Sequence, residues 1–210
     1  MKIVALYILI ALLGGCQSAS TQPSVSYFEL PAGQKADTAT FAGGCFWCVE
    51  AAFEQIRGVY EVVSGYAGGT AETADYETVS SGKTNHTETV QIYFDPAIID
   101  YPTLLDIFFT AHDPTQLNRQ GPDKGPQYRS AIFYHNQMQK NAALAKIREL
   151  NPSFSNEIVT EISAYTAFYP AEAYHQDYEK HHPFQPYILQ VSKPKIERVR
   201  AKFRDLLKEE

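Results

Sequence analysis

The chain has 210 residues, of which 44% are hydrophobic and 20% are charged. This composition is typical of a folded globular protein and excludes a disordered or collagen-like chain. The net charge of −6 leaves no basic excess to neutralise phosphates, which argues against a nucleic-acid-binding protein. A domain of this size forms a sufficient core without disulfides, so the three cysteines call for other roles.

The N-terminal segment resembles an export signal. Lys2 precedes an apolar run, Ile3–Leu13, which is too short for a comfortable transmembrane helix, so residues 1–15 are predicted to be a signal peptide. The run ends in Leu13-Gly14-Gly15-Cys16, which resembles the lipobox of bacterial lipoproteins. The resemblance implies that Cys16 is lipidated and anchors the chain on the periplasmic side of the cell envelope, at the outer membrane. A plain signal peptide with an unpaired Cys16 is the alternative.

Residues 16–34 form the predicted lipidated N-terminus and flexible tether. Their composition shifts to Ser, Thr, Gln, Pro, Ala and Gly, with few periodic apolar positions. We therefore expect one folded domain over residues 35–210.

The folded part alternates between strand and helix patterns. Period-two or β-rich runs predict strands at Thr38–Ala42, Glu61–Tyr66, Thr87–Phe94, Arg129–Tyr134 and Glu157–Ser163. Helical spacing of apolar residues predicts helices at Cys45–Arg57, Thr103–Ala111, Gln137–Leu150, Ala171–His181 and Lys195–Lys208. The order begins β-α-β-β-α-β, so we expect an α+β fold: a ferredoxin-like two-layer α/β sandwich with a mixed sheet and extra C-terminal helices. The long connections 68–85 and 113–127 are candidate functional loops.

Two cysteines lie on one face of the first predicted helix. Positions 45, 48, 49, 52, 53 and 56 share this face. Cys45 follows Gly43-Gly44 and is expected in the first turn, where free N–H groups and the helix dipole favour a thiolate, so it is a candidate nucleophile. Cys48 lies one turn further, at a spacing that can close a disulfide. Its alternative role is that of a small core residue.

A zinc site is the alternative use of a Cys-x-x-Cys pair. His175, His181 and His182 are the available partners for a four-ligand site. They lie far downstream on a predicted helix, and the chain has no second Cys-x-x-Cys. We therefore expect no metal.

Glu88 is a candidate general acid. It shares the parity of Val90, Ile92 and Phe94 in its predicted strand, which places it on the buried face. Burial raises the pKa of a carboxyl group and allows it to carry a proton near neutrality. The alternative is a carboxylate at the strand end that turns out to solvent.

Five blocks of the sequence together resemble the peptide methionine sulfoxide reductase A family. They occur in order between about Thr40 and Tyr178, and the first and fourth are long and specific. The blocks are Gly43-Gly44-Cys45-Phe46-Trp47-Cys48-Val49-Glu50, Gly65-Tyr66-Ala67-Gly68-Gly69 with Tyr76 following, Asn85-His86-Thr87-Glu88, the segment His112–Ser130, and Ala171-Glu172-Ala173-Tyr174-His175-Gln176.

The resemblance implies reduction of the S epimer of methionine sulfoxide, peptide-bound or free. We expect the chain to act as a monomer and to need no cofactor. It places the catalytic cysteine at Cys45, which becomes a sulfenic acid, and the proton donor at Glu88. The implied recognition residues are Phe46 and Trp47 for the methyl group, Tyr76 and Tyr128 with Glu88 for the oxygen, and Asp123 behind them to hold water.

Two features depart from the family pattern. Asn85-His86-Thr87-Glu88 replaces the usual Gly-His-Ala-Glu, which keeps the acid. The recycling cysteines that many relatives carry near the C-terminus are missing, because Val191–Glu210 contains no cysteine. We therefore expect Cys48 to attack the Cys45 sulfenic acid, and a thioredoxin-like partner to reduce the resulting disulfide.

Other functions explain fewer of these residues. A generic thioredoxin-like thiol–disulfide oxidoreductase uses the cysteine pair but gives no role to Trp47 or Glu88. A cysteine hydrolase pairs Cys45 with His86 or His175 as a base. A passive envelope binding module needs no reactive thiol.

Overall fold

The computed structural model describes residues 35–209, so the predicted signal segment, Cys16 and the tether lie outside the described residues. The strands are β1 (Asp37–Gly43), β2 (Val59–Ala67), β3 (Thr87–Phe94), β4 (Arg119–Gln120), β5 (Asp123–Lys124), β6 (Ser130–Tyr134), β7 (Glu161–Ala164) and β8 (Phe168–Pro170). The α-helices are α1 (Phe46–Glu54), α2 (Tyr76–Ser80), α3 (Tyr101–Ala111), α4 (Gln137–Leu150), α5 (Tyr178–His181) and α6 (Lys193–Lys202).

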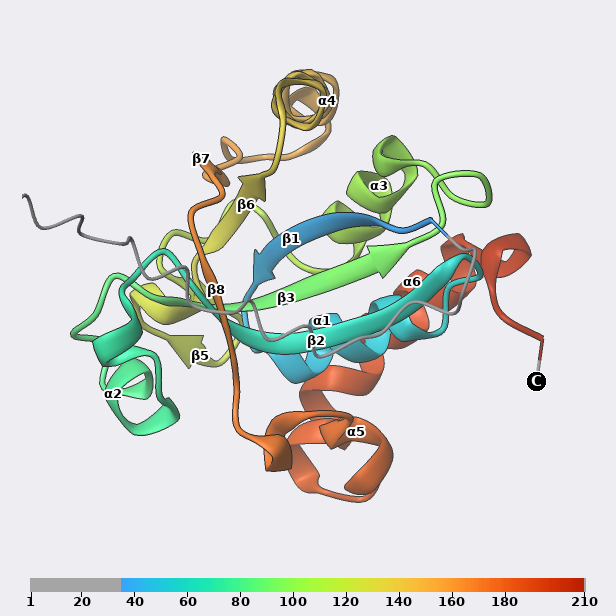
Figure 1. Ribbon diagram of the computed structural model, residues 1–210. Coiled ribbons are helices and arrows are strands. Elements are labelled where there is room, and N and C mark those ends of the chain that lie inside the picture. The colour runs from blue at the N-terminus through green and yellow to red at the C-terminus, as the bar shows by residue number, and fades with distance from the viewer. Residues whose placement is uncertain (1–34, 210) are drawn as a thin grey trace, which may run out of the picture.

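Six strands form one sheet in the order β7-β6-β1-β3-β2-β8 (Figure 1). The central neighbours β6, β1, β3 and β2 pair antiparallel, as in a ferredoxin-like β-α-β-β-α-β unit. β7 joins β6 in parallel after the crossover through α4, and β8 joins β2 antiparallel. The predicted fold class and mixed sheet are confirmed.

One face of the sheet packs against α1 and α3, and α6 packs on these two helices (Figure 1). Alternation along β3 directs Val90, Ile92 and Phe94 into this core. The rings of Phe41 and Phe108 stack at 4.9 Å between β1 and α3. Each buried side chain of this size contributes about 1.5–3 kcal/mol. The result is the two-layer sandwich that the sequence predicted.

The single helix predicted over Ala171–His181 is wrong. A 3-10 turn covers Ala173–His175, Asp177 has a φ of 53°, and α5 begins only at Tyr178. Hydrogen bonds to a distant strand prevent this segment from forming the helix that its apolar spacing predicted. The Gln176 side chain accepts from the Ser64 N–H at 2.9 Å and donates to the Ser64 carbonyl at 3.0 Å, which fixes the segment in an open form against β2.

The last helix also differs from its prediction over Lys195–Lys208. α6 starts at Lys193, because Pro194 in the first turn needs no N–H partner. It ends at Lys202, and the following chain returns to the end of α1, where the Arg57 N–H donates to the Leu206 carbonyl at 2.7 Å. Within residues 35–209, no helix combines the length and apolar composition that crossing a bilayer requires.

The turn between β1 and α1 requires glycine. Gly44 has a φ of 90°, and a Cβ atom there would lie 2.5 Å from Cβ of Gln120. The hairpin β4–β5 that carries Gln120 therefore approaches the backbone directly before Cys45. Gly44 thus sets both the start of α1 and the position of this hairpin.

Substitution of Gly44 with alanine is expected to cost about 3 kcal/mol of unfolding free energy, because backbone strain adds to the steric clash. Gly121→Ala is the matched control. Gly121 also has a positive φ, of 62°, but a Cβ atom there meets nothing within 4 Å. It is expected to cost about 1 kcal/mol from backbone strain alone. Urea denaturation of both variants checks this, and equal losses would contradict the close contact with Gln120.

Candidate active site

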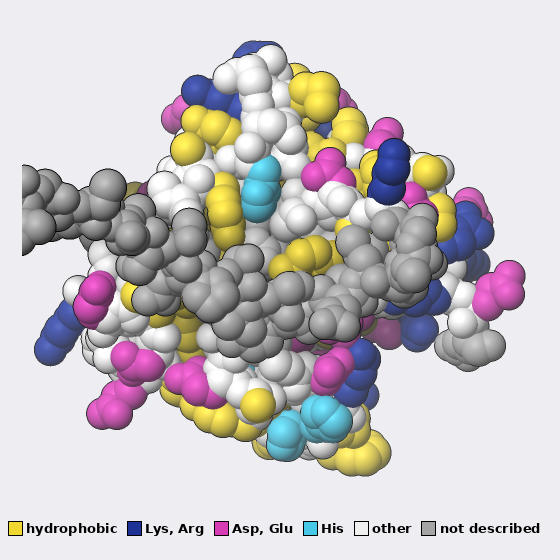
Figure 2. All heavy atoms as spheres, in the orientation of Figure 1, with side chains coloured by type: hydrophobic (Ala, Val, Ile, Leu, Met, Phe, Trp, Pro, Cys, Tyr) yellow, Lys and Arg dark blue, Asp and Glu magenta, His cyan; other side chains and the backbone are white. Residues whose placement is uncertain are grey.

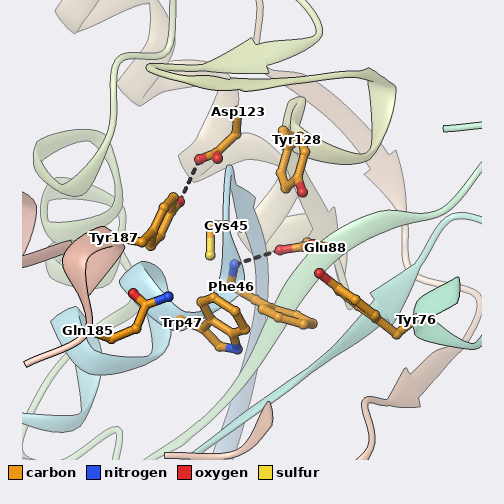
Figure 3. A pocket seen from close by; sticks show the side chains of 9 residues that line it. All are labelled: Cys45, Phe46, Trp47, Tyr76, Glu88, Asp123, Tyr128, Gln185 and Tyr187. Carbon is orange, nitrogen blue, oxygen red and sulfur yellow. Dashed lines mark hydrogen bonds between the residues drawn. The ribbon is translucent and has the colours of Figure 1, made fainter. Parts of the chain in front are cut away.

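A pocket of about 220 Å³ opens where β1 ends and α1 begins (Figure 3). Every residue that the sequence assigned to catalysis or substrate binding lines it, except Cys48. The lining residues are Cys45, Phe46, Trp47, Tyr76, Glu88, Asp123, Tyr128, Gln185 and Tyr187. They come from α1, α2, β3, the segment 123–128 and the segment before α6, so the fold gathers distant parts of the chain at this point.

Cys45 is the residue that precedes α1 and not, as expected, a member of its first turn. Its φ and ψ of −54° and 123° are not helical, and the helix begins at Phe46. The Sγ atom lies at the pocket (Figure 3), although only 5% of the residue is exposed. Burial raises the pKa of the Cys45 thiol well above its usual value, with a further contribution from Cys48. The helix dipole therefore does not decide the ionisation of this thiol.

Glu88 lies at the start of β3 on the buried face, 3% exposed. Its Oε2 accepts a hydrogen bond from the Phe46 N–H at 3.0 Å, directly after Cys45 (Figure 3). Burial raises the pKa of this carboxyl to about 8, and the hydrogen bond offsets only part of that effect. Glu88 therefore holds a proton at neutral pH, beside the thiol.

Three phenols surround the thiol and the acid. Tyr76 and Tyr128 line the pocket, and burial raises the pKa of both, so they remain hydrogen-bond donors. Tyr187 donates to Oδ2 of Asp123 at 2.6 Å (Figure 3). This hydrogen bond orients Asp123 toward the pocket and leaves its second carboxylate oxygen available as an acceptor.

Aromatic rings form one wall of the pocket. Phe46 and Trp47 lie 6.2 Å apart, and the Trp47 ring stacks on Tyr178 at 3.7 Å. The indole N–H of Trp47 donates to Nδ1 of His175 at 3.2 Å. His175 also packs against Tyr76 at 4.5 Å between ring centroids, so it supports the wall from behind and does not line the pocket.

The segment 113–128 is a fixed loop that carries Asp123 and Tyr128. The Gln120 side chain forms two hydrogen bonds with the backbone of Asp113. It accepts one from the Asp113 N–H at 3.2 Å and donates one to the Asp113 carbonyl at 2.9 Å. Gln127 donates to the Ser80 carbonyl at 3.1 Å, and the Thr87 hydroxyl donates to the Gln127 carbonyl at 2.9 Å. The threonine at position 87, where the usual pattern has alanine, therefore attaches this loop to β3 directly before Glu88.

Cys48 lies beneath Cys45 and not in the pocket. It is 1% exposed, and its Sγ lies 2.8 Å from Oγ of Ser192, at the end of the π-helical segment Ile188–Ser192. Neither of these two cysteines is in a disulfide. A hydrogen bond from the Cys45 thiol lowers the pKa of Cys48 to about 6, so the pair carries one negative charge near neutral pH.

The histidines do not complete a metal or hydrolase site with the cysteines. In the described part of the chain, no group of three or more His, Cys, Asp and Glu side chains could hold a metal ion. His175 is buried behind the aromatic wall, whereas His181 and His182 are exposed, and histidine side chains are visible at the edge near α5 (Figure 2). Nε2 of His86 forms a hydrogen bond with the Thr70 carbonyl at 2.9 Å and not with a thiol.

Tyr187 and Gln185 are site residues that the sequence reasoning missed. Both lie between the last predicted helices, in the segment Pro183-Phe184-Gln185-Pro186-Tyr187. Two prolines in five residues restrict the backbone of such a segment, which is the one signal that pointed to a fixed position. Nothing local indicated that it covers the thiol pair.

A thiol pair, a protonated acid, phenol donors and an aromatic wall around a small pocket define a thiol-dependent reductase of a small polar substrate. Residues 37–207 match the family model described as peptide methionine sulfoxide reductase. A relative from Thermus thermophilus, peptide methionine sulfoxide reductase MsrA, is 54% identical over 172 residues, which cover 82% of this chain and 98% of the relative. A second MsrA, from Pasteurella multocida, is 50% identical over 170 residues, covering 81% and 98%.

The solved structure of reduced Mxr1 from Saccharomyces cerevisiae aligns with a TM-score of 0.69 and 33% identity, covering 76% of this chain and 92% of that one. The chain belongs to the peptide methionine sulfoxide reductase family. It is an enzyme that reduces methionine sulfoxide.

The pKa of Glu88 predicts the alkaline limb of the pH profile. Because the carboxyl is protonated below about pH 8, kcat/KM for a sulfoxide substrate is expected to fall as the pH rises above this value. Glu88→Gln should lose about 10²–10⁴-fold in activity and also lose this limb.

Glu50→Gln is the matched control. Glu50 is 2% exposed with a pKa that burial raises to about 8, but it does not line the pocket. This variant should keep the alkaline limb. A limb that persists near pH 8 in Glu88→Gln, or disappears in Glu50→Gln, would assign the titration to another group.

Proposed function

We propose that this protein reduces the S epimer of methionine sulfoxide as a monomer, with Cys45 as the nucleophile and Glu88 as the acid. One observation carries this proposal: the N–H that follows Cys45 donates to the buried Glu88 carboxyl, which places a proton donor beside the thiol. A generic disulfide oxidoreductase has no use for that acid or for the aromatic wall.

The substrate is recognised by its two small groups. The methyl group packs against Phe46 and Trp47, since an apolar and polarizable group suits an aromatic surface. The sulfoxide oxygen is a strong acceptor and receives hydrogen bonds from Tyr76, Tyr128 and protonated Glu88. Only one epimer can direct its methyl group to the aromatic rings and its oxygen to the donors at the same time. That epimer places its sulfur at Cys45.

The first half-reaction forms a sulfenic acid. The Cys48 thiolate takes the proton of the Cys45 thiol, and the Cys45 thiolate attacks the sulfoxide sulfur. Glu88 protonates the sulfoxide oxygen as the S–O bond to the substrate breaks. Methionine departs with its sulfur reduced by two electrons, and Cys45 retains the hydroxyl as a sulfenic acid.

The second half-reaction regenerates the thiols. Cys48 attacks the Cys45 sulfur, the hydroxide leaves as water with one proton, and a Cys45–Cys48 disulfide forms. A dithiol partner of the thioredoxin kind then reduces this disulfide. The yeast relative Mxr1 has been solved in complex with Trx2, which supports a partner of this type.

The same protein is proposed to be a lipoprotein of the bacterial cell envelope, anchored through Cys16 at the periplasmic side of the outer membrane. The support is the sequence Leu13-Gly14-Gly15-Cys16 after an apolar run. In this position the enzyme reduces methionine sulfoxide, either as a residue of envelope proteins or as the free amino acid.

Turnover of a dabsyl-methionine sulfoxide with dithiothreitol, run separately on the two epimers, tests the reaction. The S epimer is expected to be reduced by the wild type and not by Cys45→Ser. Reduction of the R epimer alone, or full activity in Cys45→Ser, would refute the proposal.

One turnover without reductant, followed by tryptic mass spectrometry, tests the role of Cys48. We expect a Cys45–Cys48 disulfide in the wild type and a Cys45 sulfenic acid in Cys48→Ser. A wild-type enzyme that retains the sulfenic acid beside a free Cys48 would show that Cys48 does not resolve it.

Labelling of the expressed full chain with a palmitate analogue tests the anchor. Wild type should incorporate the label and partition into the membrane fraction, and Cys16→Ala should do neither. Equal labelling of both would contradict lipidation at Cys16.

A further inference from the structure

Lys195 is a buried lysine without a hydrogen-bond partner. It is only 9% exposed, and among the described residues its Nζ has no hydrogen-bond partner. A buried ammonium is costly unless a negative charge lies nearby. The surroundings of Lys195 must therefore supply an anion.

Lys195 lies close enough to Cys48 for the charges of the two side chains to interact. The π-helical segment Ile188–Ser192 runs directly into α6, so Ser192 and Lys195 are three residues apart and share one helical face. This face packs against α1, where Sγ of Cys48 lies 2.8 Å from Oγ of Ser192. The charge of Lys195 lowers the pKa of Cys48, after the larger contribution of the hydrogen bond from Cys45.

We propose that Ser192 and Lys195 form a thiolate-stabilising site for Cys48 and are positioning residues for the recycling half of the reaction. This inference rests on the proposed role of Cys48 as the resolving thiol. Ser192 donates a hydrogen bond to the Cys48 sulfur, and Lys195 supplies the balancing positive charge. Neither residue lines the substrate pocket.

The site acts twice in each cycle. In disulfide formation, Cys48 gives up the proton that it took from Cys45, its thiolate attacks the Cys45 sulfenic sulfur, the S–S bond forms, and the S–O bond breaks to release the hydroxide with that proton as water. In reduction, a thiolate of the partner attacks the disulfide at Cys45 and Cys48 leaves as a thiolate. A stabilised thiolate is the better leaving group.

The difference in burial between the two cysteines determines which sulfur of the disulfide the partner thiolate attacks. Cys45 lines the open pocket, whereas Cys48 lies beneath it and is 1% exposed. The partner thiol therefore reaches Cys45 first, and the mixed disulfide forms there. Cys48 is then released next to Lys195.

The titratable groups that face the Cys48–Lys195 pair come from four elements. Cys45 and Tyr187 lie close to the Cys48 sulfur, and Glu88 interacts with its charge from β3. His112, at the end of α3, lies in the field of Lys195, and burial lowers its pKa to about 4, so it stays neutral while Cys48 titrates. Lys195 is thus the cation that acts on Cys48.

The ultraviolet absorbance of the Cys48 thiolate, titrated in the Cys45→Ser background, tests the site directly. Adding Lys195→Met should raise the midpoint by about one pH unit, and Lys195→Arg should restore it. Lys193→Met removes a charge from the same helix at a less buried position and should leave the midpoint unchanged. Ser192→Ala, which makes a smaller change, is the second variant and should also raise the midpoint.

Rapid-quench mass spectrometry of otherwise wild-type chains gives the kinetic readout. In Lys195→Met, disulfide formation is expected to be about tenfold slower at pH 5, where the thiolate is the minor form of Cys48, and about twofold slower at pH 7, relative to the methionine released in the same samples. An unchanged midpoint together with an unchanged disulfide rate would overturn the proposal. A wild type that forms no disulfide would refute only the recycling role of Cys48, since the thiolate titration does not depend on that role.

Discussion

The hydrogen bond from the Phe46 N–H to the buried Glu88 carboxyl is the interaction on which the site depends. It joins the residue after the nucleophile to the acid that serves it. Removing a carboxyl from water disfavours its charged form, and each unit of raised pKa corresponds to about 1.4 kcal/mol. The surrounding core and loops stabilise the fold enough to keep the Glu88 carboxyl buried despite this cost. That position makes the carboxyl a proton donor at neutral pH.

The sheet topology explains why the site forms where it does. β1 and β3 are antiparallel neighbours, with Phe41 opposite Val90, so the end of β1 lies beside the start of β3. Cys45 follows β1 and Glu88 begins β3, and the two therefore meet at one end of the sheet. β6 pairs with β1 on the other side, with Ser130 opposite Gly43, which brings the loop with Asp123 and Tyr128 to the same end.

Much of this arrangement was predictable from local patterns, and the remainder depends on contacts between distant segments. Period-two alternation along β3 placed Glu88 on the buried face, and helical spacing placed Cys48 one turn beyond Cys45. The structure of 171–181 was not predictable in this way, because Gln176 bonds to β2 instead of continuing a helix. The role of Tyr187 was not predictable for a related reason, since it depends on a hydrogen bond to Asp123, 64 residues earlier in the chain.

The two cysteines occupy different environments a single turn apart: Cys45 meets the substrate beside an acid, and Cys48 lies beneath it beside a cation. The reaction requires that Glu88 is protonated when substrate binds. Carbon-13 NMR of glutamate-labelled protein, with the signal assigned by its loss in Glu88→Gln, measures this directly. We expect a Glu88 carboxyl that is neutral at pH 7 and titrates near pH 8. A Glu88 carboxylate that is already ionised at pH 7 would contradict it.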